Sequence, residues 1–122
     1  MSGHILTVDD SASIRMTTKI ALSGAGYTIT EAVDGADGLA KVRSGTFDLI
    51  VTDLNMPNMD GLTMIENIRK LPNQAGVPII FLTTESDGDI KARAKAAGAT
   101  GWLTKPFDPE MLVKIVKKVL GR

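Results

Sequence analysis

The chain has 122 residues, the size of one domain with a single hydrophobic core. It has no cysteine, which excludes disulfides, thiolate metal sites and thiol nucleophiles, and neither its first residues nor its apolar runs match a signal peptide or a membrane span. The formal net charge is zero, but residues 1–90 hold six Lys/Arg against twelve Asp/Glu, and residues 91–122 hold eight against two. We expect a cytoplasmic protein. Its uneven charge indicates either a few solvated helix faces or an acidic site with a separate basic face that binds a partner.

Short apolar or β-branched runs alternate with segments of helical spacing along the chain. The runs that predict strands are residues 5–8, 27–32, 49–52, 79–83 and 101–104. Strands separated by helices of about ten residues indicate a parallel sheet with helices on both faces. The sequence therefore predicts an α/β fold, a doubly wound sheet of five parallel strands with five helices.

The segments between these runs place apolar or small residues at helical spacing. The first predicted helix has one face made of Ile14, Thr17, Thr18, Ala21 and Leu22. The second has a face made of Ala36, Leu39, Ala40 and Arg43. Glycines end the first, second and fourth predicted helices, and Pro109 stands at the start of the fifth, which are the usual stop and start signals.

Polar and charged residues stand where four of the predicted strands end. They are Asp9 and Asp10 after the first strand, Asp53 after the third, Thr83 and Thr84 at the end of the fourth, and Lys105 after the fifth. The carboxyl ends of parallel strands meet at one edge of the sheet, where open α/β folds bind their ligands. We therefore expect three carboxylates, the hydroxyl groups and one ammonium group to gather at that edge.

Three neighbouring carboxylates need a compensating charge. Two of them about 5 Å apart repel by roughly 3 kcal/mol at an effective dielectric constant of about 20, so all three do not stay ionised alone. Oxygen ligands without His or Cys favour a hard divalent ion, and Mg²⁺ is the natural choice. Lys105 adds a positive charge that can also meet an anionic ligand. The simpler interpretation of a single residue is a helix cap, as Asp10 or Ser11 could provide.

The stretch DLNMPNMDG, residues 53–61, follows the third strand. Asn55 comes two residues after Asp53, so its main-chain carbonyl can turn back toward a metal ion. Pro57 stiffens the turn, and Asp60-Gly61 is a turn dipeptide that starts the next helix. The pattern predicts a loop that holds the carboxylate of Asp53 exposed and fixed.

Four segments, VDDS, DLNMPNMDG, PIIFLTTES and GATGWLTKPF, occur in an order and at spacings that resemble the receiver domain of bacterial response regulators. Within that family the chain is similar to the single-domain, CheY-like chemotaxis receivers, and the resemblance covers essentially the whole chain. It implies a flavodoxin-like fold with strand order 2-1-3-4-5. It also implies one receiver domain over residues 1–122 with no output domain.

The resemblance implies that Asp53 is the phosphoacceptor, which attacks a phosphoryl group on a histidine of a sensor kinase. The implied Mg²⁺ ligands are Asp10, Asp53 and the carbonyl of Asn55, with Asp9 close by through water. Lys105 would pair with a phosphoryl oxygen, and its bond to Pro106 would be cis. Such a protein is not an enzyme toward other substrates, because it catalyses only its own phosphorylation and dephosphorylation.

In this family a hydroxyl, here Thr83, couples the phosphoryl group to an aromatic residue on the last strand. That aromatic is usually Tyr or Phe but is Trp102 in this chain, and its indole N–H needs a partner. Thr84 is a second departure, since the family usually has a small residue there, and a threonine narrows the access of phosphodonors. Asn55 and Glu85 occupy the positions that tune hydrolysis, which implies a short-lived phosphoryl group.

The family's output surface consists of the fourth helix, the fifth strand and the fifth helix. Many basic residues fall on these elements, namely Lys91, Arg93, Lys95, Lys114, Lys117 and Lys118. Such a surface favours an acidic protein partner, such as a flagellar motor switch protein or a kinase domain, over DNA. We expect a monomer that binds neither nucleic acid nor membranes. A phosphate sink, which drains the kinase without binding the motor, would use the same site, and the sequence does not separate the two roles.

Two other classes share parts of this pattern. A flavodoxin-like FMN protein needs a phosphate-binding loop after the first strand, but Asp9 and Asp10 stand there and repel phosphate. A haloacid-dehalogenase-type phosphatase needs an acid two residues after its nucleophile, and that position is Asn55. Both alternatives are therefore less favoured than a receiver.

Overall fold

The computed structural model describes residues 3–72, 76–84 and 88–121. The strands are β1 (His4–Val8), β2 (Thr28–Ala32), β3 (Leu49–Thr52), β4 (Ile79–Thr83) and β5 (Gly101–Thr104). They alternate with the helices α1 (Ala12–Gly24), α2 (Gly35–Ser44), α3 (Gly61–Ile68), α4 (Gly88–Ala96) and α5 (Pro109–Leu120). The strands form one parallel sheet in the order β2-β1-β3-β4-β5, which confirms the predicted fold class and strand order.

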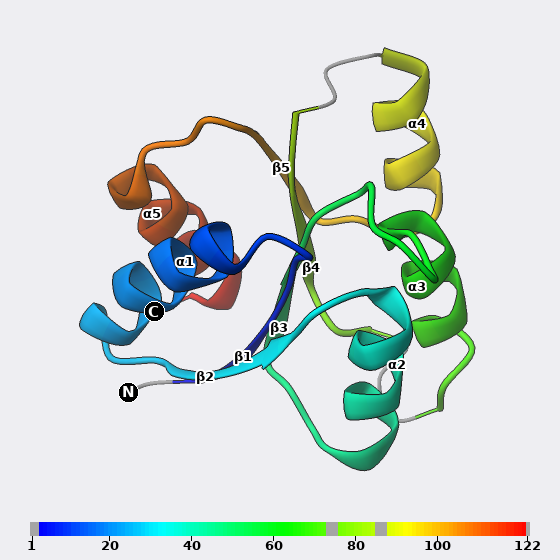
Figure 1. Ribbon diagram of the computed structural model, residues 1–122, viewed down its shortest axis with the longest axis horizontal. Coiled ribbons are helices and arrows are strands. Elements are labelled where there is room, and N and C mark those ends of the chain that lie inside the picture. Colours follow the sequence, from blue (N-terminus) through cyan, green and yellow to red (C-terminus); the bar gives the residue numbers. More distant parts are fainter. Residues whose placement is uncertain (1–2, 73–75, 85–87, 122) are drawn as a thin grey trace.

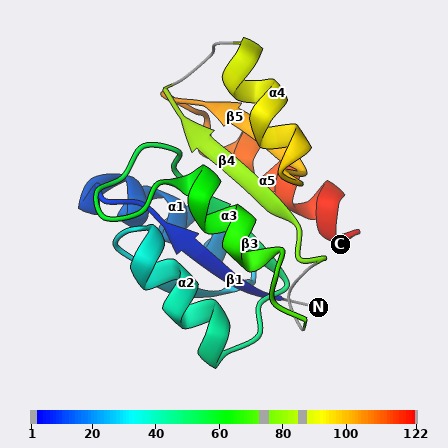
Figure 2. The same cartoon turned by 90° about the vertical axis from the view of Figure 1, so that its right-hand side faces the viewer.

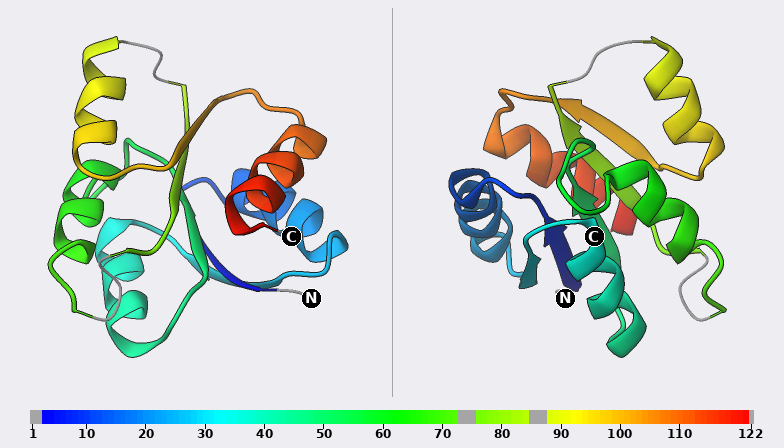
Figure 3. Two further views of the ribbon diagram at one scale, coloured as in Figure 1. Left: turned by 180° about the vertical axis from the view of Figure 1, so that it is seen from behind. Right: turned by 45° about the vertical axis from the view of Figure 1, so that its right-hand side comes forward.

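The sheet separates two helical layers (Figure 1). Helices α1 and α5 pack together on one face, and α2, α3 and α4 cover the other, as Figure 2 and both views of Figure 3 also show. Each face has its own core because successive strand residues point to opposite sides. Leu6 and Ile50 pack under α2 and α3, whereas Ile5 and Val51 pack under α1 and α5.

The two strands at the centre of the carboxyl edge are completely covered. Every residue of β3 and of β4 is buried, because helices lie over both faces of the sheet. That is why both strands are continuous apolar runs in the sequence rather than alternating ones. Strand β2 lies at the edge of the sheet and is partly exposed.

Short polar side chains start four of the helices at the carboxyl edge of the sheet. In each, the side chain of the N-cap residue accepts a hydrogen bond from a main-chain N–H of the first turn, and these residues are Ser11, Asp34, Asp60 and Asp108. These caps determine where the helices begin. They therefore also set the length of the strand-to-helix loops that carry the candidate site. Of the two caps proposed for α1, Ser11 provides it.

The buried face of α2 differs from the one predicted. Ala36, Ala40 and Arg43 are exposed, while Leu39, Gly38 and other residues face the core. A Cβ atom on Gly38 would lie 2.8 Å from the sulfur of Met64, so the glycine allows α2 to approach α3 closely. Hydrophobic spacing alone does not show such a contact, since a glycine has no side chain to count.

Two smaller differences concern α1 and β2. Thr17 is exposed rather than buried, and its hydroxyl donates a hydrogen bond to the carbonyl of Ser13, 3.0 Å away on the solvent side. Strand β2 begins at Thr28 rather than one residue earlier. The N–H of Tyr27 instead donates to the carbonyl of Leu22 at 3.2 Å, which completes the C-terminal turn of α1. In the part of the chain that the structure describes, no helix is long and apolar enough to cross a membrane.

Candidate functional site

Three carboxylates meet at the carboxyl edge of the sheet. Asp9 and Asp10 follow β1 and Asp53 follows β3, and one oxygen from each lies within 4.8 Å of the others. The ends of β1 and β3 are in register, because Val8 pairs with Thr52 and the N–H of Asp53 donates to the carbonyl of Val8 at 2.9 Å. The predicted acidic cluster is thus present in the fold.

The three carboxylates differ in exposure. Asp9 is only 4% exposed, Asp53 is partly buried, and Asp10 is exposed. A ligand that approaches from solvent would therefore meet Asp10 and Asp53 first, while Asp9 forms the base of the site.

Lys105 extends from the β5–α5 loop into this cluster. Its Nζ lies 2.8 Å from Oδ2 of Asp9 and 3.3 Å from Oδ2 of Asp53, and its side chain is 12% exposed. The main-chain N–H of Lys105 donates to the carbonyl of Thr83 at 2.8 Å, which fastens the loop to the end of β4. The Lys105–Pro106 bond is cis, as the resemblance implied.

The environment of Asp53 disfavours its charged form. Burial is the largest cause and raises the pKa of Asp53 above its ordinary value, and the charge of Asp9 raises this pKa further. Lys105 and the N–H of Leu54 act in the opposite direction and offset only part of the effect. Three carboxylates face a single ammonium group in this cluster, which favours the binding of a divalent cation.

The donor set fits Mg²⁺. The candidate ligands are carboxylate oxygens, with no nitrogen or sulfur ligand in the cluster that the structure describes. One oxygen of Asp53, Oδ1, accepts a hydrogen bond from the N–H of Leu54 at 2.7 Å, which fixes the orientation of the carboxylate. The other oxygen, Oδ2, faces Lys105.

The two ends of the β3–α3 loop, residues 53–60, lie in close contact with each other. The N–H of Gly61 donates to the carbonyl of Leu54 at 2.7 Å, which brings the two ends of the loop together. A Cβ atom on Gly61 would lie 2.4 Å from the carbonyl oxygen of Asp53, so only glycine fits at this position. Asn55 is exposed on the loop, where its carbonyl remains a predicted ligand.

The two predicted switch residues lie on neighbouring strands. Thr83 is fully buried at the end of β4, and Trp102 on β5 pairs in register with Phe81. The rings of Phe81 and Trp102 are 5.8 Å apart between centroids, and Nζ of Lys91 lies 5.6 Å from the indole centroid. The indole Nε1 is buried and has no hydrogen-bond partner among the residues described. Thr84 is exposed, and Glu85 lies outside the described residues.

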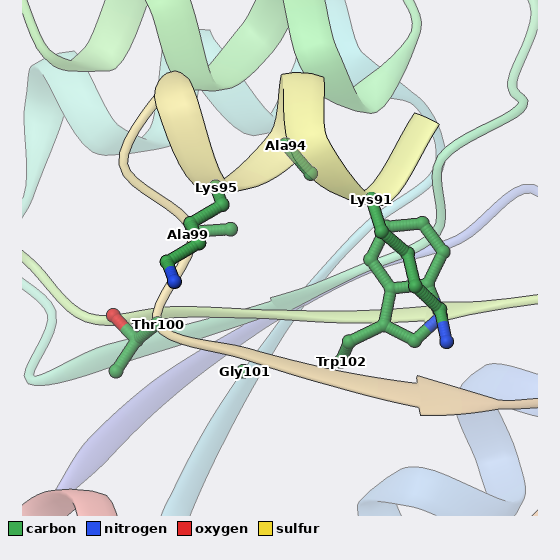
Figure 4. Close-up of a pocket in the computed structure, with 7 residues that line it drawn as sticks. All are labelled: Lys91, Ala94, Lys95, Ala99, Thr100, Gly101 and Trp102. Atoms are coloured by element: carbon green, nitrogen blue, oxygen red, sulfur yellow. The ribbon is translucent and has the colours of Figure 1, made fainter. Parts of the chain in front are cut away.

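A groove of about 300 Å³ lies between α4 and β5. Figure 4 shows Lys91 and Lys95 projecting from α4 over the strand that carries Trp102. The other lining residues are Ala94, Ala99, Thr100 and Gly101. The groove therefore combines an apolar floor with ammonium groups at its rim.

Sequence reasoning did not identify Arg15 as part of the site. Its guanidinium donates a hydrogen bond to the main-chain carbonyl of Asp9, and its Nε lies 3.6 Å from a carboxylate oxygen of Glu31. Arg15 thus connects the β1–α1 loop to β2. Its position five residues after Asp10, one helical turn into α1, is the only sequence signal that could have indicated it.

Comparison with known proteins agrees with this geometry. The model of the response regulator receiver domain family matches residues 5–117. The chain belongs to the response regulator receiver domain family. This receiver is 36% identical over 119 residues to the chemotaxis protein CheY of Pseudomonas aeruginosa, a match that covers 97% of this chain and 96% of that relative.

Solved structures give the same result. This receiver superposes on the chemotaxis protein CheY4 of Vibrio cholerae with a TM-score of 0.93 and 43% identity, covering 98% of this chain and 99% of that one. It also resembles the receiver domain of a Pseudomonas aeruginosa sensor histidine kinase, solved with a magnesium ion coordinated in its active-site cleft, with a TM-score of 0.91, 28% identity and full coverage of both chains at 100%.

Receivers also occur as parts of longer proteins. This chain is 37% identical over 119 residues to the DNA-binding transcriptional regulator NtrC of Escherichia coli, but it spans only 25% of that relative's length. Family membership alone therefore does not assign an output to this receiver.

Proposed function

We propose that this receiver accepts a phosphoryl group on Asp53, from a phosphohistidine of a sensor kinase, in a Mg²⁺-dependent reaction. The observation that carries the proposal is the position of Asp53, between two other carboxylates and the ammonium group of Lys105. A structural carboxylate would gain nothing from this setting, in which burial and, to a smaller degree, the charge of Asp9 raise its pKa. A phosphoacceptor gains from it, because the same groups bind the metal and the incoming phosphoryl oxygens.

In the proposed reaction an oxygen of Asp53 attacks the phosphorus, the phosphorus–nitrogen bond breaks, and the histidine ring of the donor keeps the electron pair and takes up a proton. Asp10, Asp53 and the Asn55 carbonyl would hold the metal ion directly, with Asp9 close by through water. The ion would offset charge on the phosphoryl oxygens. Lys105 would turn from Asp53 to a phosphoryl oxygen. The contact of Leu54 with Oδ1 leaves Oδ2 as the attacking oxygen.

Water would then release the phosphoryl group, and Asn55 and Glu85 would set the rate of this autodephosphorylation. If Asn55→Lys or Glu85→Leu leaves the dephosphorylation rate unchanged, that part of the proposal is wrong. The phosphoryl group would draw Thr83 toward it before it is lost, and Trp102 would change its packing in response. The burial of Thr83 at the end of β4, beside the Lys105 loop, supports this coupling.

The proposed output surface is the face formed by α4, β5 and α5. The groove between α4 and β5 carries Lys91 and Lys95 at its rim, which suits an acidic segment of a protein partner (Figure 4). The likeness to chemotaxis proteins over nearly their whole length supports a flagellar motor switch protein as that partner. The receiver would act as a cytoplasmic monomer. A phosphate sink is the second candidate, and binding to a motor switch peptide distinguishes the two.

The acceptor chemistry is tested with acetyl phosphate as a small donor. The protein is incubated with an excess of the donor, with and without Mg²⁺, quenched in acid, and its intact mass is measured. We expect a gain of one phosphoryl group that requires both Mg²⁺ and Asp53, and that is absent from Asp53→Asn. Asp48→Asn is the matched control, because it makes the same chemical change at an exposed position outside the acidic cluster. No gain in the wild-type protein from either acetyl phosphate or a phosphorylated kinase would contradict the proposal.

A further inference from the structure

The β3–α3 loop is attached to the β2–α2 turn by two hydrogen bonds. The side-chain Nδ2 of Asn58 donates to Oδ2 of Asp34 at 2.7 Å, and the N–H of Gly35 donates to the carbonyl of Met59 at 3.1 Å. Both bonds join segments more than twenty residues apart in the sequence, as the separation of 24 for the first one shows. The loop that carries Asp53 is therefore fixed by the β2–α2 turn as well as by the contacts at its own ends.

The environment of Asp34 is specialised for this contact. Asp34 is 8% exposed, and its other oxygen, Oδ1, accepts the N-cap hydrogen bond from Asp37 N–H at 2.8 Å. These two bonds lower the pKa of Asp34, the backbone bond from Asp37 being the larger cause. Both carboxylate oxygens are thus engaged, one by the α2 helix and one by the loop.

The loop conformation at this contact is unusual. Asn58 has a φ of 67°, in the left-handed region, which asparagine tolerates better than most residues. A Cβ atom on Gly35 would lie 2.2 Å from the carbonyl oxygen of Met59, so the turn approaches the loop as closely as a backbone can. The N–H of Met59 also donates to the carbonyl of Pro57 at 2.7 Å, which tightens the chain on the side of Asn55.

We propose that Asp34 is a positioning residue for the metal site. It is not a member of the acidic cluster formed by the described carboxylates. It acts through Asn58, whose fixed conformation sets the path of the chain back to Asn55 and Asp53. The inference rests on the proposed function, because it concerns the Mg²⁺ site on this same loop.

Exchanging the side chains of Asp34 and Asn58 tests this inference. Asn58→Asp leaves two carboxylates facing each other, which removes the donor and pushes the loop away from the turn. Asp34→Asn combined with Asn58→Asp restores a hydrogen bond with donor and acceptor exchanged, and it keeps the helix cap, since Asn and Asp cap equally well. Asp34→Asn alone is the control for the loss of one negative charge. It keeps the hydrogen bond, because the amide of Asn58 can rotate so that its oxygen accepts from the amide N–H of the new asparagine.

The Mg²⁺ dissociation constant is measured by calorimetry, and the free energy of unfolding is measured separately in urea and chelator. We expect Asn58→Asp to weaken Mg²⁺ binding about tenfold, and the double variant to return to within about twofold of wild type. Electrostatics alone predicts tighter Mg²⁺ binding by Asn58→Asp, because an added carboxylate near the site attracts the cation.

Each outcome has a distinct meaning. Mg²⁺ binding by Asn58→Asp that equals or exceeds that of wild type overturns the inference, as does a double variant that is not restored. A loss of stability in Asn58→Asp with an unchanged Mg²⁺ dissociation constant also overturns it, since Asp34 would then only support the fold. Absence of Mg²⁺ binding by the wild-type protein would contradict the proposed metal site itself, and with it the inference about Asp34.

Discussion

The ammonium group of Lys105 lies 3.3 Å from Oδ2 of Asp53, the oxygen proposed to attack phosphorus. In the metal-free protein this contact occupies the attacking oxygen and offsets part of its charge. In the proposed reaction, Lys105 would exchange a carboxylate oxygen for a phosphoryl oxygen. The same exchange would pull on the β5–α5 loop, which is bonded to the end of β4 through the carbonyl of Thr83.

Removing this ammonium group should have opposite effects on stability and on metal binding. In Lys105→Met, Asp9 and Asp53 lose their partner, so the metal-free protein should lose about 2 kcal/mol of unfolding free energy. Mg²⁺ should bind at least about threefold more tightly, because a competing cation is gone. Calorimetry and urea unfolding check both effects, with Lys114→Met at an exposed position of α5 as control. Weaker Mg²⁺ binding would show that Lys105 does not compete with the metal.

The raised pKa of Asp53 predicts a pH dependence of stability in the metal-free protein. A carboxyl group whose pKa is higher in the folded than in the unfolded state binds its proton more tightly when folded. Its stabilising contribution is therefore complete below the unfolded pKa, near 3.8, and is lost as the pH rises through the folded pKa. An asparagine side chain cannot ionise, so Asp53→Asn should be the more stable protein at pH 7 without Mg²⁺.

Urea unfolding of the wild-type protein and of Asp53→Asn between pH 4 and pH 7, in chelator, measures the difference in their unfolding free energies directly. The advantage of Asp53→Asn should shrink toward pH 4 and should also shrink when Mg²⁺ is added, because Mg²⁺ stabilises only the wild-type protein by binding to its folded state. A variant that is less stable than wild type at pH 7 in chelator would mean that Lys105 outweighs burial at this site.

Two glycines that differ in their surroundings predict opposite effects of alanine. Gly61→Ala places a Cβ atom 2.4 Å from the carbonyl of Asp53 and 2.7 Å from the ring of Phe81, so it should cost about 3 kcal/mol of unfolding free energy and weaken Mg²⁺ binding. Gly24→Ala, at the end of α1 with no atom within 4 Å of the new Cβ, should be neutral or stabilise by up to about 1 kcal/mol. Equal effects of the two changes in chemical denaturation would contradict the loop geometry.

The single tryptophan reports on the proposed switch. Trp102 is the only tryptophan in the sequence and contacts Phe81 and Lys91, so its fluorescence should change when acetyl phosphate and Mg²⁺ are added together. Asp53→Asn should abolish the change because no phosphoryl group forms. Thr83→Ala should reduce the change while the intact mass still shows phosphorylation. A full fluorescence change in Thr83→Ala would mean that the signal reaches Trp102 by another route.

The sequence predicted β3 and β4 well because their apolar runs are buried on both faces and leave little ambiguity. The gathering of Asp9, Asp53 and Lys105 followed from one rule, that the ends of parallel strands share an edge. The link from Asp34 to Asn58 could not be predicted in this way, since it depends on how closely two loops approach in three dimensions. Nor could the buried position of Gly38, which is defined by the space that Val8 and Met64 fill.

The central claim is that Asp53, and not a neighbouring carboxylate, carries the phosphoryl group. Borohydride reduces an acyl phosphate of aspartate to homoserine, so treatment of the protein after acetyl phosphate and Mg²⁺, followed by peptide mass spectrometry, identifies the modified position. Our account predicts homoserine at position 53, and none at that position when Mg²⁺ is withheld. Homoserine at position 9 or 10 with position 53 unmodified would contradict it.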